Sequence, residues 1–100
     1  MMNKIKVFKL ISGEELIGEV FNSYDTHVVL KSPATILMQQ TQQGVGLGLM
    51  PYMPYAEGDI DIMKNAIASE ATPSTKMVNE YNRLFGSGIE IAPASALASL

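Results

Sequence analysis

Few side chains in this sequence could carry out chemistry. There is one histidine, His27, and no cysteine among 100 residues. A single histidine cannot build a histidine-based metal cluster, and thiolate sites and disulfides need cysteine. No nucleophile elbow surrounds a serine or threonine that could work with His27. We therefore expect neither an enzyme nor a bound metal or cofactor, and the absence of cysteine favours a reducing compartment.

Acidic pairs and a glycine run are the next candidates. The pairs are Glu14-Glu15 and Asp59 with Asp61. Paired carboxylates can transfer protons or bind a cation, but solvated turns and strand faces explain these pairs more simply. The glycine run, Gly44-Val45-Gly46-Leu47-Gly48, lacks the following helix that a phosphate-binding loop requires. A proline-containing extended segment follows it, so hairpin backbone is the better interpretation.

The composition limits the partners of the chain. Its net charge is −3, and only 17% of its residues are charged while 47% are hydrophobic. An acidic balance argues against a broad basic face that follows a phosphate backbone. So few charges in one small domain favour self-association over a slightly apolar monomer. There is no apolar run long enough to cross a membrane and no apolar core of a signal peptide, so we expect no membrane association.

The elements that must position these side chains are mostly strands. Ile5 and Val7 alternate with lysines, which indicates a half-buried strand. Gly18 lies inside the next apolar run and predicts a bend, which is more typical of a barrel than of a flat sheet. Pro33 predicts that the third strand is bent or lies at an edge. Further extended runs cover residues 27–40, 45–55, 60–62 and 66–71, with a polar tip at 39–43 and a proline break after 50. The pattern predicts a small, strongly bent β-barrel.

One helix is expected after the strands. Thr72 and Pro73 are typical of an N-cap and a first helical position, and Gly86 is typical of a helix stop. Apolar residues recur at helical spacing and predict a face that packs on the barrel: Met77, Tyr81, Leu84 and Phe85. Residues 87–100, rich in Ala, Ser and Gly, are expected to form a tail with one short extended piece at 89–91. Residues 1–86 are the expected domain.

Residues 5–71 resemble the Sm/LSm/Hfq family of small ring-forming RNA-binding barrels. The first matching stretch is Gly18-Glu19-Val20 followed by Tyr24-Asp25-Thr26-His27-Val28-Val29-Leu30-Lys31. It is similar to the family signature of a glycine, an apolar residue, an aromatic-Asp pair and an apolar run. The second, Met63-Lys64-Asn65-Ala66-Ile67-Ala68-Ser69, resembles the Tyr-Lys-His-Ala-Ile-Ser turn of Hfq. The resemblance implies a mostly β, Sm-like (SH3-like), strongly bent five-stranded antiparallel open barrel, here with one C-terminal helix.

The resemblance also implies a site, because both turns face the central pore in that family. Carried over, His27 stacks on a nucleobase, Lys64 supplies positive charge, and Asn65 stands where the family has histidine. The RNA-binding residues implied are Asp25, Thr26, His27, Lys64 and Asn65, with Asp25 orienting the loop. Stacking combined with a cation suits single-stranded RNA. The implied protein is a homo-oligomeric ring of about five to seven subunits, an RNA chaperone of a phage-type Sm-like kind in the bacterial host cytoplasm.

A second function stays open at this point, namely a ring-shaped adaptor or structural protein that binds protein and no nucleic acid. The acidic balance and the replacement of the family histidine by Asn65 favour it. So does the cluster Met50-Pro51-Tyr52-Met53-Pro54-Tyr55, since methionine and tyrosine adapt well to protein partners. The same cluster also fits the apolar edge where one barrel meets the next.

Overall fold

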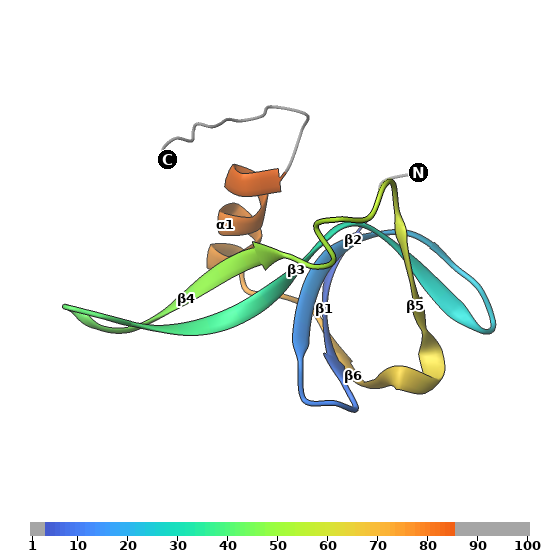
Figure 1. Cartoon of the computed structure of the whole chain (residues 1–100), viewed down its shortest axis with the longest axis horizontal. Helices are drawn as coiled ribbons and strands as arrows, with labels where there is room; N and C mark the ends of the chain where they lie inside the picture. Colours follow the sequence, from blue (N-terminus) through green and yellow to red (C-terminus); the bar gives the residue numbers. More distant parts are fainter. Residues whose placement is uncertain (1–3, 86–100) are drawn as a thin grey trace.

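The computed structural model describes residues 4–85, and strands make up most of them (Figure 1). The strands are β1 (Lys4–Leu10), β2 (Glu15–Ser23), β3 (His27–Thr41), β4 (Gly44–Pro51), β5 (Ile60–Met63) and β6 (Ile67–Ala71). A short 3-10 helix, η1 (Lys64–Ala66), joins β5 to β6, and the α-helix α1 (Thr75–Phe85) follows. The protein is therefore mostly β with one helix after the strands, as the sequence predicts.

All strand pairs in the sheet are antiparallel. The order is β4-β3-β2-β1-β6, and β5 pairs with β3 off this path. The long strand β3 has two partners, because residues 27–30 pair with β5 and residues 34–41 pair with β4. The proline-containing segment 52–59 separates these partners, so the predicted break in the fourth strand is confirmed. The sheet has six strands rather than five for this reason, and it curls strongly without closing into a barrel.

The sharp bend in the sheet lies at Gly18. The register of β2 and β3 shifts between the pairs Ile17–Ala34 and Glu19–Lys31, so Gly18 faces two residues of β3, Ser32 and Pro33. Ser32 has a φ of 47°, a left-handed conformation that occurs in one class of β-bulge. A Cβ on Gly18 would lie 3.3 Å from the Cα of Pro33. The predicted bends at Gly18 and Pro33 are thus two sides of one irregularity within the sheet.

The two faces of the sheet have separate hydrophobic clusters. The inner, concave face holds Phe8, Leu10, Leu16, Val28, Leu30 and Ile62. The outer face packs against α1 through Ile17, Ala34 and Tyr81, with partly buried Met77 and Phe85 beside them. Leu16 and Ile17 are neighbours in sequence yet both fully buried, because alternate strand residues point to opposite faces.

The helix differs in two details from the sequence-based prediction. The Oγ of Ser74, and not of Thr72, accepts the capping hydrogen bond from the Met77 N–H at 3.2 Å, so α1 begins two residues later than expected. Leu84 is 39% exposed and lies at the margin of the packed face, so its predicted burial is wrong. Met77, Tyr81 and Phe85 do pack on the sheet, as predicted. The predicted helix stop at Gly86 and the tail at 87–100 lie outside the described residues.

Candidate nucleic-acid interface

The two turns that carry the predicted site lie side by side. In the first, the N–H of Tyr24 donates to the carbonyl oxygen of His27 at 2.8 Å and closes the loop between β2 and β3. The second turn, η1, is tied to this loop by a bond of 2.9 Å from the Lys64 N–H to the Thr26 carbonyl oxygen. Register pairing of His27 with Met63 adds a further link. The fold therefore brings residues 24–27 and 63–65 together, although some 40 positions separate them in sequence.

The imidazole of His27 is held from three sides. Its Nδ1 lies 2.9 Å from the Thr26 Oγ1, and its Nε2 lies 4.0 Å from a carboxylate oxygen of Asp61. The ring of Tyr24 packs beside it, with centroids 5.0 Å apart and planes inclined by 31°. The Asn22 side-chain amide donates to the Tyr24 hydroxyl at 2.9 Å and holds that ring in turn. These contacts make His27 a preoriented, half-buried ring at the rim of the sheet.

The other predicted site residues are exposed around this ring. Asp25, Thr26, Lys64 and Asn65 all present their side chains to solvent. Within residues 4–85, Lys64 makes no ion pair, so its ammonium group is available to a ligand. The Asp25 side chain makes no hydrogen bond within that range, so backbone bonds and Thr26, rather than Asp25, fix the loop.

Two residues of the site were not predicted as part of it. Tyr24 was recognised only as part of a motif, and Asp61 only as part of an acidic strand face. The three-residue spacing from Tyr24 to His27 across a turn could have indicated the ring pair. Asp61 could have been found only from the pairing of β5 with β3, which sequence alone does not supply. Asp61 and Asp25 add negative charge to the same turns that carry Lys64.

The remaining candidates from the sequence form no second site. In residues 4–85, no group of three or more His, Cys, Asp or Glu residues could hold a metal ion. The glycine run lies in strand β4, opposite β3, and does not form a phosphate-binding loop. Over the same part of the chain, none of the helical segments has the length and apolarity needed to cross a bilayer.

Comparison with known proteins assigns no family to this chain. No protein-family model matches the sequence, and a search of curated proteins finds no match. The resemblance to the Sm-like family therefore depends on the two motifs and their order along the chain.

Proposed function

We propose that this protein is an Sm-like, ring-forming protein that binds single-stranded RNA at the site around His27 and Lys64. The observation that supports it best is the hydrogen bond from the Lys64 N–H to the Thr26 carbonyl oxygen. This bond ties the turn that carries Lys64 to the loop that carries His27, so a cation and a preoriented ring lie on adjacent turns. One nucleotide could then stack its base on the ring and place its phosphate near the cation. Stacking on a ring tolerates any base, while the cation favours the backbone of the same nucleotide.

Ring assembly would strengthen this site. A ring repeats Lys64 once per subunit, and a collar of such charges attracts RNA even when the net charge of the chain is negative. Within residues 4–85, the outer edges of β4 and β6 have no partner strand, and they lie at opposite ends of the sheet order. Pairing of β4 in one copy with β6 in the next is head-to-tail, and a head-to-tail contact closes into a ring when the rotation permits. We expect about five to seven subunits, acting as an RNA chaperone in a bacterial host cytoplasm.

Fluorescence anisotropy with short U-rich and A-rich RNAs at low salt tests the binding. Lys64→Ala should weaken the binding of both RNAs and flatten its salt dependence, because one phosphate contact is lost. His27→Ala should cost about 1–3 kcal/mol per stacked base. Lys76→Ala, on α1, is the matched control and should bind like the parent. Equal binding by the parent and both site variants would place RNA elsewhere, and no binding by the parent would end the proposal.

The assembly is tested separately by light scattering of the unliganded protein. We expect a mass of several subunits that is unchanged in Lys64→Ala and His27→Ala, because His27 begins β3 and Lys64 lies in η1, so neither residue belongs to β4 or β6. A monomer at high concentration would contradict the ring.

A protein-binding adaptor is the second candidate, and one observation favours it. Residues 32–56 contain no charged side chain, and several of their apolar side chains are exposed, including Met38, Met50 and Tyr55. Exposed uncharged surface of this kind is typical of protein contacts. A pull-down from host lysate with and without nuclease separates the two functions, because a protein partner that resists nuclease supports the adaptor.

A further inference from the structure

A second exposed ring lies on β2, outside the site around His27. Phe21 is 53% exposed, although its side chain is large and apolar. The ammonium group of Lys31, on the neighbouring strand β3, lies 5.6 Å from the centroid of this ring. At this distance a cation is attracted to the face of an aromatic ring. Phe21 and Lys31 therefore form a ring–cation pair, as His27 and Lys64 do at the proposed site.

An irregularity of the sheet explains why Phe21 is so open. The register of β2 and β3 passes from the pair Val20–Leu30 directly to the pair Asn22–Val29, so Phe21 is an extra residue without a register partner on β3. A bulge of this kind increases the local twist and can re-aim a side chain. The ring is thus left without a cross-strand neighbour opposite it, and its surface is open to a ligand.

The two ring–cation pairs lie on the same face of the sheet. Along β3, His27, Val29 and Lys31 share one face, because alternate residues of a strand point the same way. It is the outer face, since Val28 and Leu30 between them belong to the inner cluster. Four residues of strand separate His27 from Lys31, which is a distance of about 13 Å. The second pair therefore lies behind the first along one strand.

Side chains of β2 and the loop after it connect the two pairs. The side-chain amide of Asn22, next to Phe21, donates a hydrogen bond of 2.9 Å to the Tyr24 hydroxyl. The Tyr24 ring in turn packs beside His27. Phe21, Asn22 and Tyr24 are all exposed. An open path of side chains, with a ring at each end, therefore runs along the outer face.

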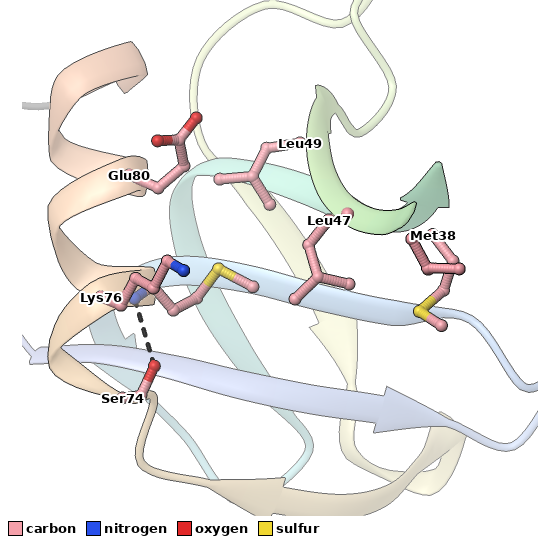
Figure 2. A pocket seen from close by; sticks show the side chains of 9 residues that line it. Met38, Leu47, Leu49, Ser74, Lys76 and Glu80 are labelled. Atoms are coloured by element: carbon pink, nitrogen blue, oxygen red, sulfur yellow. Dashed lines mark hydrogen bonds between the residues drawn. The ribbon is translucent and has the colours of Figure 1, made fainter. Parts of the chain in front are cut away.

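The groove between α1 and the β3–β4 hairpin lacks these features (Figure 2). Its volume is about 550 Å³, and it is lined by apolar side chains such as Leu47 and Leu49 together with Lys76 and Glu80. None of its lining residues is aromatic, so a base has no ring to stack on there. Lys76 is thus a cation without a ring, which makes it a matched control for Lys31.

We propose that Phe21 and Lys31 form a second nucleotide-binding position, and that one RNA strand follows the outer face from His27 to Phe21. This inference rests on the proposed function, which places the first nucleotide at His27 and Lys64. At the second position a base stacks on the Phe21 ring, and the Lys31 ammonium attracts the adjoining phosphate. Glu19, the register partner of Lys31, adds a carboxylate here, which argues against a site for a free anion and favours a nucleotide held by its base.

The length of the RNA separates the two positions. A stacked strand rises about 3.4 Å per nucleotide, so a distance of about 13 Å needs about four nucleotides. A U-rich hexanucleotide can reach both positions, whereas a dinucleotide can occupy only one at a time. Calorimetric titration of the full-length protein with each RNA at low salt measures both affinities without a label.

Phe21→Leu keeps an apolar side chain but removes the ring. It should weaken binding of the hexanucleotide at least about fivefold, and leave the dinucleotide at the first position nearly unaffected. Lys31→Gln should reduce the slope of log affinity against log salt by about 0.7 for the hexanucleotide, because one phosphate contact is lost. The matched controls are Tyr55→Leu, at a largely exposed ring elsewhere, and Lys76→Gln, and both should bind like the parent.

Photochemical cross-linking of the parent protein gives a second measurement that needs no variant. A hexanucleotide that carries 5-iodouridine should become attached to the peptide that contains Phe21, as mass spectrometry would detect. Unchanged hexanucleotide binding by Phe21→Leu, with no cross-link at Phe21, would overturn this inference and leave the proposed function standing. Equal losses for both RNAs would overturn it as well, because Phe21 would then only support the loop at Tyr24. Failure of the parent to bind either RNA would end the proposed function and this inference with it.

Discussion

The hydroxyl group of Tyr81 on α1 donates a hydrogen bond of 2.9 Å to the carbonyl oxygen of Ser32 on β3. The carbonyl oxygen of Lys31 lies at the same distance from this hydroxyl and shares its proton. Both carbonyls belong to the bulge opposite Gly18, where the regular ladder between β2 and β3 is interrupted. The Tyr81 side chain is only 1% exposed, so water cannot replace it as a donor. One helix residue therefore satisfies the backbone groups that the bend removes from the sheet.

Tyr81→Phe should destabilise the protein by about 1–3 kcal/mol, the cost of leaving buried polar groups without a partner. The aromatic ring and its packing against Phe85 remain. Tyr55→Phe is the matched control, because Tyr55 is largely exposed, and it should change stability by less than about 0.5 kcal/mol. Urea unfolding followed by circular dichroism measures both. Equal midpoints for the parent and Tyr81→Phe would mean that the bend does not need this bond.

Stability should also fall in alkali because of the same side chain. Burial raises the pKa of Tyr81 from 10.0 to about 12. A backbone hydrogen bond involving Glu19 opposes this rise. The folded state thus keeps its proton to a higher pH than the unfolded state, and the stabilisation is complete below pH 10 and is lost as the pH rises towards 12. The loss is up to about 1.4 kcal/mol per pH unit.

The measurement is the unfolding midpoint of the parent and of Tyr81→Phe from pH 9 to 12. Because other groups titrate equally in both proteins, the difference between them isolates the contribution of Tyr81 ionisation. The difference in stability between the two proteins should shrink above pH 10. A difference that stays constant to pH 12 would show that Tyr81 titrates normally.

Gly18→Ala should destabilise the fold by about 1–3 kcal/mol, because the added methyl group meets the backbone of Pro33 at 3.3 Å and Leu30 at 3.4 Å. Gly46→Ala is the matched control in another strand, where the nearest atom to an added Cβ is 3.8 Å away, on the Thr41 side chain. Thermal unfolding of the two variants should give a clearly lower midpoint for Gly18→Ala alone. A similar midpoint for both variants would show that the bulge between β2 and β3 can relax around an added methyl group.

Local sequence signals predicted the strands well because each signal acts over a few residues. The bend at Gly18 and the proline break after Met50 reappear in the structure. The strand at Ile5 and Val7 also forms, but both of its faces are covered, and Phe8 and Leu10 on the opposite face are its buried residues. The prediction of the helix start was wrong because Thr72 and Ser74 are both good capping residues, and the path of the chain after β6 decides between them. The predicted burial of Leu84 was wrong because the face of α1 that packs on the sheet is narrower than the apolar stripe in the sequence.

The site was harder to predict because it depends on contacts across the sheet. The resemblance located His27 and Lys64, but only the pairing of β3 with β5 places Asp61 beside the imidazole. The contact between Tyr24 and His27 likewise depends on the tight closure of the loop by a backbone bond. Neither relationship has a signature in residue type alone, since a lone acidic residue on a strand face is usually solvated.

Asp61→Asn provides the sharpest test of the proposed RNA site. The Asp61 carboxylate lies 4.0 Å from His27 and repels any phosphate that approaches the ring. Its removal should tighten the binding of short RNAs by roughly two- to fivefold at low salt, and this gain should shrink as salt screens the charges. Asp59→Asn makes the same charge change two residues earlier, away from the imidazole, and should have a smaller effect. Anisotropy titrations of both variants over a range of salt concentrations measure the difference. Weaker binding by Asp61→Asn would instead mean that the carboxylate orients His27 for stacking, and equal effects of the two variants would place the bound RNA away from this site.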